Sequence, residues 1–148
     1  MEHTELEWAY LAGIVDGEGS CTIALAGKRR PFPNVAMLTV TNTDARLVQW
    51  LVSKFQGKPY PRAIPARAKP AWNVCWAGKN AKEILLHIQP YLLIKGQQAG
   101  TLLAFIALLG RRSPGGGVRV TTDDNISKRR VLAEAMAILN NRGERTWR

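Results

Sequence analysis

Two carboxylates, Asp16 and Glu18, stand between glycines in the stretch Leu11–Gly19, which reads Leu-Ala-Gly-Ile-Val-Asp-Gly-Glu-Gly. The apolar residues before them predict the buried end of a helix. Glu18 would then lie at the helix C-terminus, where unpaired carbonyls and the helix dipole already favour positive charge. A further carboxylate there favours a cation, and an all-oxygen site suits a hard divalent metal.

The same helix is expected to carry a stripe of small residues, because Ala9, Gly13 and Gly17 recur at every fourth position. Small residues at this spacing are typical of helices whose backbones approach closely. The stripe therefore predicts a tight helix-packing surface beside the two carboxylates.

The stretch Leu11–Gly19 resembles the signature of the LAGLIDADG homing endonucleases, with conservative changes at its fourth, fifth, seventh and eighth positions. The resemblance implies an α+β fold with an αββαββα core, a curved antiparallel DNA-binding sheet and additional C-terminal helices. It also implies an intron-encoded, site-specific endonuclease that cuts both DNA strands and leaves 3′ overhangs. The alternative interpretation is an ordinary amphipathic helix that ends on a glycine.

Phosphodiester hydrolysis needs an activated water and neutralisation of the developing charge, which metals held by carboxylates can supply. By resemblance, Glu18 and the carbonyl of Gly17 are the expected ligands of Mg²⁺ or Mn²⁺. Asp16 is expected instead to accept hydrogen bonds from backbone amides near the helix end.

Three further residues match polar positions around the metals of this family. Asn42 matches a position often held by a glutamine that orients water, although its side chain is shorter. Arg46 matches a basic residue near the scissile phosphate, and Lys95 matches a lysine that follows an apolar helix start. His3 and His87 have no partners at ligand spacing and receive no role.

The chain has 148 residues, of which 46% are hydrophobic, and a formal net charge of +10. These values suit one domain over residues 1–148, with its core at about residues 4–110. The positive charge favours double-stranded DNA as partner, because neutralised phosphates release counterions. No run is apolar enough for a membrane span and the N-terminus is acidic, so we expect an intracellular protein (cytoplasm, nucleoid or organelle) without a membrane partner. Cys21 and Cys75 are expected to be reduced and partly buried, although their sequence leaves a disulfide open.

Hydrophobic periodicity and turn residues predict the order of elements along the chain. A Thr4/Glu7 capping box predicts the first helix, with Leu6, Tyr10, Leu11, Ile14 and Val15 as its apolar positions. The further expected elements are strands over Ser20–Arg30 and Asn34–Asn42, a helix capped by Thr43 or Asp44, strands over Tyr60–Lys69 and Trp72–Ala77, a helix capped by Asn80 and broken at Pro90, a helix over Leu92–Leu109, a loop over residues 113–117, and a helix from Thr121 or Thr122 to about Asn141 with Ile126, Val131, Leu132, Met136 and Leu139 inward.

The outward residues of the four strands are the expected DNA contacts, since a two-stranded ribbon fits the major groove. In the fourth strand we place Trp72, Val74 and Trp76 inward. The expected DNA-binding residues are Thr22, Ala24, Ala26, Lys28, Arg29, Arg30, Thr39, Thr41, Arg62, Arg67 and Asn73. The alternatives are that these are solvated surface residues and that the basic run at residues 28–30 binds phosphates alone, which positions the protein without conferring sequence specificity.

One copy of the signature, in a chain too short for two such domains, predicts a homodimer through Ala9, Gly13 and Gly17. The dimer would bring two Glu18 residues together and span a long pseudo-palindromic target. A non-catalytic or dual-function RNA maturase, which binds its intron RNA, or a DNA-binding regulator is the alternative on the same scaffold. A general basic RNA-binding protein is a third hypothesis.

Overall fold

The computed structural model describes residues 2–25, 27, 31–62, 65–66, 69–110 and 121–141. Its elements follow the predicted order, with helices added after the second pair of strands. They are α1 (Glu5–Glu18), β1 (Gly19–Ala24), β2 (Val35–Asn42), α2 (Ala45–Phe55), β3 (Lys58–Pro61), β4 (Trp72–Ala77), α3 (Gly78–Ile88), the short 3-10 helix η1 (Gln89–Tyr91), α4 (Gly96–Leu109) and α5 (Asp123–Asn141). This order confirms the αββαββα core of an α+β fold.

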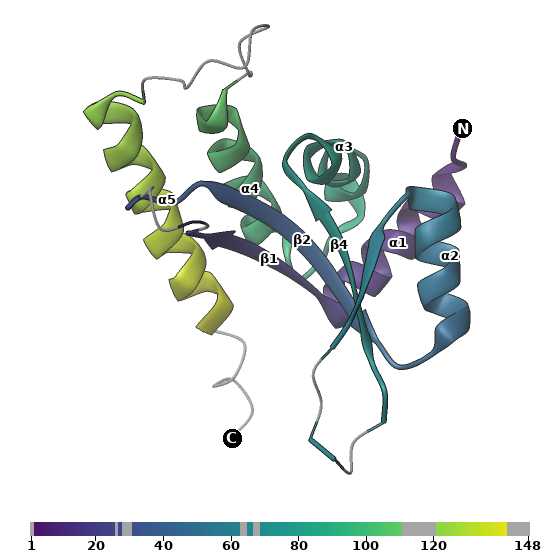
Figure 1. Cartoon of the computed structure of the whole chain (residues 1–148). Coiled ribbons are helices and arrows are strands. Elements are labelled where there is room, and N and C mark those ends of the chain that lie inside the picture. Colours follow the sequence, from purple (N-terminus) through teal and green to yellow (C-terminus); the bar gives the residue numbers. More distant parts are fainter. Residues whose placement is uncertain are drawn as a thin grey trace, which may run out of the picture.

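The four strands form one antiparallel sheet in the order β1-β2-β4-β3. Figure 1 shows β1 and β2 running across the molecule, with α5 near one end and α1 and α2 near the other. Alternate residues of the two central strands are buried, among them Leu38, Val40, Val74 and Trp76. Their burial confirms the inward facing predicted for both strands, because successive side chains of a strand point to opposite faces.

Helices pack against the buried face of the sheet and complete the core. α1 and α3 contact β2, while α4 contacts both β1 and β2. The largest fully buried side chains come from these helices, from α2 and from the sheet, and include Leu11, Leu38, Leu51, Leu85 and Phe105. The opposite face of the sheet is left without a helix in the described part of the chain.

Helix α5 covers the outer edge of β1. The Asn140 side-chain amide donates to the Cys21 carbonyl at 3.0 Å, which occupies an acceptor that an edge strand would leave unpaired. Arg129, only 6% exposed, donates to the carbonyls of Leu108 and Pro33 and so ties α5 to α4 and to the start of β2. Thr122 accepts from the Asn125 amide, as expected for a cap of this helix.

Two predicted strands are shorter than expected. β1 ends at Ala24, and Leu25 beyond it is exposed instead of continuing the inward row. β3 spans only four residues, Lys58–Pro61. The Arg62 backbone N–H donates to the Ala71 carbonyl, so the N–H groups of the even-numbered residues of β3 point toward β4. The backbone nitrogens of Pro59 and Pro61 therefore point to the open edge of the sheet, where no hydrogen-bond donor is needed.

Two helix starts also differ from prediction. α3 begins at Gly78 directly after β4, so Asn80 lies inside its first turn and is not its cap. α4 begins at Gly96 and not at Leu92, because the segment before it is held outside the helix by Asp16, as described below. Pro90 breaks the helical path as predicted, within η1.

Three residues assigned to helix cores are exposed in this chain: Leu6, Tyr10 and Val131. The first two lie on the open side of α1, and the third lies on the outer side of α5. The loop predicted at residues 113–117 lies outside the described residues. No helix in the described ranges is long and apolar enough to cross a membrane.

Candidate active site

The chain passes from α1 into β1 without a connecting loop, and this junction presents Glu18. The Gly19 amide closes the helix on the Val15 carbonyl. A Cβ atom at Gly19 would lie 2.6 Å from that carbonyl oxygen, so only glycine fits the close approach. Glu18 is therefore the last residue of α1, and it is exposed at the end of the sheet.

Asn42 lies at the same end of the sheet as Glu18. Gly19 pairs with Val40, which brings the residue before Gly19 close to the end of β2. The Asn42 side-chain oxygen accepts from the Asp44 amide at 2.7 Å. The Asn42 side chain thus shapes the turn into α2 and is half-buried at the end of the sheet where Glu18 lies.

Arg46 is held by Asp44, which the sequence predicts only as a possible helix cap. Its Nη2 and Nε atoms lie 2.6 and 3.1 Å from the two Asp44 carboxylate oxygens. The Arg46 side chain is nevertheless 92% exposed. Tyr10, Asn42, Asp44, Arg46, Leu47 and Trp50 line an open hollow of about 670 Å³. The spacing Asp-x-Arg at a helix start could have indicated this ion pair.

The ion pair is expected to control the titration of Asp44. Its hydrogen bond with Arg46 lowers the pKa of Asp44 from 3.8 to about 2. A lowered pKa means that the interaction is complete above pH 3.8 and is lost as the pH falls toward 2. Arg46→Ala should therefore move the Asp44 midpoint in an NMR titration up toward its ordinary value.

Arg130→Ala, which removes an exposed arginine of α5, serves as the control for the change in net charge. An unchanged Asp44 midpoint in Arg46→Ala would contradict the ion pair, whereas the same upward shift in both variants would indicate a general charge effect.

Lys95 lies at the C-terminal end of α1, where its Nζ donates to the Asp16 carbonyl at 2.6 Å. The Asp16 carboxylate in turn accepts from the amides of Leu93, Ile94 and Lys95, at 2.8, 3.2 and 3.0 Å. Asp16 therefore bonds backbone amides as predicted, but these belong to the segment before α4 and not to its own helix. Burial raises the pKa of the nearby Cys21 thiol to about 11, and the positive charge of Lys95 opposes this rise.

The two cysteines are unpaired thiols, with Cys21 buried on the helix side of the sheet. Cys75 lies on the other side, where its sulfur is 3.5 Å from the Thr39 hydroxyl. Since the sheet separates them, this structure excludes the disulfide that the sequence left open.

The residues that could hold a metal are the two predicted from the sequence, Glu18 and Gly17. In the described ranges no three His, Cys, Asp or Glu side chains gather closely enough to hold an ion. The Glu18 carboxylate and the Gly17 carbonyl are hard oxygen donors of the type that Mg²⁺ prefers, but Mg²⁺ takes about six ligands. The donor chemistry of these two groups fits a hard divalent ion.

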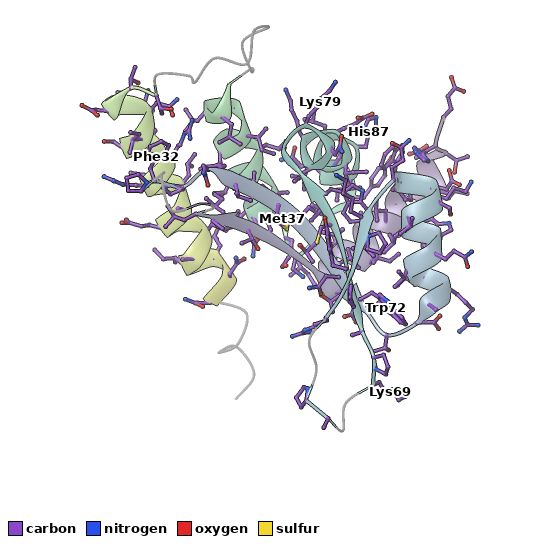
Figure 2. The ribbon with its side chains drawn as sticks, viewed as in Figure 1. Phe32, Met37, Lys69, Trp72, Lys79 and His87 are labelled. Atoms are coloured by element: carbon purple, nitrogen blue, oxygen red, sulfur yellow. The ribbon has the colours of Figure 1, made fainter. Side chains whose placement is uncertain are left out.

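The predicted DNA contacts that the structure describes share one face of the sheet. The register places Thr22, Ala24, Thr39, Thr41 and Asn73 on the side opposite the buried row. The Thr41 hydroxyl donates to the Asn73 side chain at 2.7 Å, so these two present a joined polar pair. Met37, over the middle of the sheet in Figure 2, belongs to the same face.

The basic residues expected on this face are only partly placed. Arg62 is exposed and continues the row of Lys58 and Tyr60 on β3. Ala26, the run Lys28, Arg29 and Arg30, and Arg67 lie outside the described residues. The outer face of the sheet thus contains the predicted row of polar residues. Lys58 and Arg62, at its β3 edge, are the basic residues that the structure describes on this face.

The small-residue stripe of α1 lies open at the surface. Gly13 and Gly17 have nothing within 4 Å of an added Cβ atom, and Ala9 is half-buried. Leu6 and Tyr10 beside the stripe are 82% and 59% exposed. An apolar surface of this kind favours a partner.

Both histidines lie at the other end of α1, away from Glu18. The His87 ring, on α3 in Figure 2, stacks on Trp8 with centroids 4.3 Å apart, and the His3 ring contacts the same indole at 4.8 Å. Both rings are thus part of an aromatic cluster around Trp8.

Comparison of the sequence with family models and with curated proteins finds no match. Comparison of the structure finds the homing endonuclease I-CvuI, solved with a DNA target, at a TM-score of 0.71 and 22% identity over 96% of this chain and 87% of that one. The archaeal intron-encoded I-Vdi141I, solved with DNA, matches at a TM-score of 0.72 and 12% identity over 97% and 88%. The LAGLIDADG homing endonuclease I-GzeII matches at 0.55 and 18% over 69% and 35%. The chain therefore has the fold of the LAGLIDADG homing endonucleases.

Proposed function

We propose that this protein is a site-specific endonuclease that cuts both strands of DNA in a divalent-metal-dependent reaction. The observation that carries the proposal is Glu18, an exposed carboxylate fixed at the junction of α1 and β1, at one end of the helix-free sheet face. The similar structures of I-CvuI and I-Vdi141I are complexes with DNA. I-CvuI was solved in the presence of Mg and of Ca, which supports a hard divalent ion, Mg²⁺ or Mn²⁺, as the cofactor.

The outer sheet face would lie in the major groove. Thr22, Thr39 and the Thr41–Asn73 pair can donate to or accept from base edges, while Ala24 can contact a thymine methyl group. The net charge of +10 supplies the sequence-independent attraction to phosphates. Specificity then comes from the polar row, and affinity from the basic residues around it.

At the scissile phosphate, Glu18 and the Gly17 carbonyl would hold the metal. A bound divalent metal supplies an activated water and neutralises charge on the reacting phosphate. Arg46 can exchange its Asp44 contact for a phosphate oxygen, since its side chain is exposed over the hollow. Asn42 orients solvent beside Glu18, and Lys95 places a positive charge at the same end of α1.

The protein would act as a homodimer, and the open stripe of Ala9, Gly13 and Gly17 supports a second copy packed against α1. A symmetric pair joined there brings both Glu18 residues to one end of the two-fold axis. Such a homodimer reads two half-sites of a long pseudo-palindromic target and leaves 3′ overhangs.

Gly13→Leu is expected to weaken dimerisation while leaving the fold of each chain intact. Nothing lies within 4 Å of a Cβ atom at Gly13, and leucine favours a helix over glycine by about 0.8 kcal/mol, so the fold should be retained. The bulky side chain would hold the two helices apart and raise the dimer dissociation constant by at least about tenfold. Sedimentation over a concentration series measures this constant.

Glu83→Leu adds the same exposed leucine to α3, away from the stripe, and should leave the dissociation constant unchanged. Unchanged dimerisation of Gly13→Leu would show that the stripe is not the interface.

An RNA maturase or a nucleic-acid-binding regulator on the same scaffold is the competing function. If the reading frame lies inside an intron, the joined exon sequence is the DNA site to test. Cleavage of that intronless DNA supports the endonuclease, whereas a gel shift on the intron RNA without DNA cleavage supports the maturase.

A further inference from the structure

The segment between η1 and α4 displays the most exposed large apolar side chain of the described residues. Leu93 is 93% exposed and Ile94 is 70% exposed. Their backbone is nevertheless fixed, because the amides of both residues and of Lys95 donate to the Asp16 carboxylate. Leu93 and Ile94 thus form a rigid apolar knob next to α1, and not a loose loop tip.

The same chain also carries an apolar recess. Tyr10, Leu47 and Trp50 form the apolar side of the hollow whose polar side contains Asn42 and Arg46. The rings of Tyr10 and Trp50 meet edge to face, 5.1 Å apart, which fixes the shape of this side.

The knob and the recess lie on opposite flanks of the stripe on α1. The segment around η1 is tied to Glu5 by the Tyr91 hydroxyl and to Asp16 by the three amides. At 3.6 residues per turn, positions 5 and 16 fall on one flank of the Gly13–Gly17 row and positions 7 and 10 fall on the other. On that second flank α2 meets Tyr10 through Trp50 and meets Glu7 through Lys54.

A two-fold axis along this stripe exchanges the flanks. Rotation by half a turn about an axis parallel to α1 places the knob of each copy opposite the recess of the other copy. The rotation does not change the position of either feature along the direction of α1. Both reach the C-terminal half of α1, since the knob is bonded to Asp16 and the recess is lined by residues from Tyr10 to Asn42, which is near the α1 C-terminus.

We infer that the dimer is locked by reciprocal insertion of Leu93 of each copy into the recess formed by Tyr10, Leu47 and Trp50 of the other copy. This inference rests on the proposed homodimer and specifies its contacts. Leu6, Tyr10, Leu93 and Ile94 together expose on the order of 600 Å² per chain, so a symmetric pair could bury about 1,200 Å² from these residues alone. That area is in the range of specific interfaces.

The insertion would also link assembly to the active site. Lys95 directly follows the knob; its amide donates to the same Asp16 carboxylate, and its Nζ donates to the Asp16 main-chain carbonyl. Insertion of Leu93 into the partner would therefore restrain Lys95, the lysine proposed to act at the phosphate. The same dimer contact would bring the two Glu18 carboxylates together.

Cross-linking between two differently marked chains tests the contact. Leu93→Cys is made in one chain and Leu47→Cys in the other, both with Cys75→Ser; Cys21 is fully buried and can remain. After mixing and subunit exchange, a short bis-maleimide should yield a covalent dimer in the mixture and not in either variant alone. Leu86→Cys, at an exposed position on α3, replaces Leu47→Cys in the control mixture and should give none.

A second variant gives the energetic test. Leu93→Asp should raise the dimer dissociation constant at least about tenfold, while Leu86→Asp should leave it unchanged. A protein that dimerises and cuts DNA but shows no mixed cross-link, and is insensitive to Leu93→Asp, overturns the insertion and leaves the proposed function standing. A protein that stays monomeric and does not cut DNA overturns both.

Discussion

Glu18→Gln is expected to lower the rate of DNA cleavage by at least roughly a thousandfold, because it replaces a charged oxygen ligand with a neutral amide. The substitution should leave DNA affinity nearly unchanged, since Glu18 lies at the end of the sheet and not within its outer row. It should also leave the fold intact, because Glu18 is exposed. Single-turnover cleavage and a binding titration in Ca²⁺ measure the two effects separately.

Glu83→Gln makes the same chemical change at an exposed site on α3 and should cut at the parental rate. Parental cleavage by purified Glu18→Gln would remove Glu18 from the mechanism. Equal loss of binding and cleavage would instead indicate a role in holding DNA.

The largest effect on stability is expected at Asp16. Asp16→Ala removes the acceptor of three amides and frees the segment that carries Leu93, Ile94 and Lys95. Hydrogen bonds to a charged group contribute about 1.5 to 3 kcal/mol, and partial exposure reduces their sum, so we expect a loss of about 2 to 3 kcal/mol. For a chain of this size that corresponds to a decrease in melting temperature of roughly 5 to 10 °C, measurable by calorimetry.

Asp124→Ala, at an exposed ion pair with Lys128, provides the matched control and should change the melting temperature by less than about 2 °C. Asp16→Asn keeps one acceptor oxygen, so its melting temperature should lie between those of Asp16→Ala and Asp124→Ala. A melting temperature of Asp16→Ala equal to the parent would show that the three amides are equally well satisfied by water.

The course of the strands and their facing could be predicted from sequence where alternation was regular. Leu38, Val40, Val74 and Trp76 are buried as expected because one face of a sheet must meet the helices. The Thr4 and Glu7 capping box is present in the structure, since this interaction depends only on residues three apart.

Contacts between distant segments could not be predicted. Asp16 and Leu93 are 77 residues apart, and nothing in the local pattern indicates which amides a carboxylate will accept from. For the same reason α4 starts later than its apolar run, because a long-range hydrogen bond overrides helix propensity there. Leu6 and Tyr10 are exposed because they lie on the open side of α1. Periodicity alone cannot distinguish an exposed apolar face of a helix from a face that packs in the core.

The predicted active-site residues gather at one end of the sheet, but as three local arrangements. Glu18 ends α1, Asn42 and Arg46 border the hollow, and Lys95 is fixed to Asp16. Family resemblance could indicate their positions. It could not indicate that Arg46 is paired with Asp44, because that contact depends on the side-chain conformation at the start of α2.

Metal-dependent cleavage of a defined duplex is the most direct test of the proposed function. Where the reading frame lies inside an intron, the purified protein is incubated with a plasmid that carries the joined exon sequence, with Mg²⁺ or with EDTA, and the product ends are sequenced. The proposed function predicts a single double-strand break with 3′ overhangs in Mg²⁺ and intact plasmid in EDTA. Intact plasmid in Mg²⁺, at protein concentrations that saturate the site in a gel shift, would contradict it.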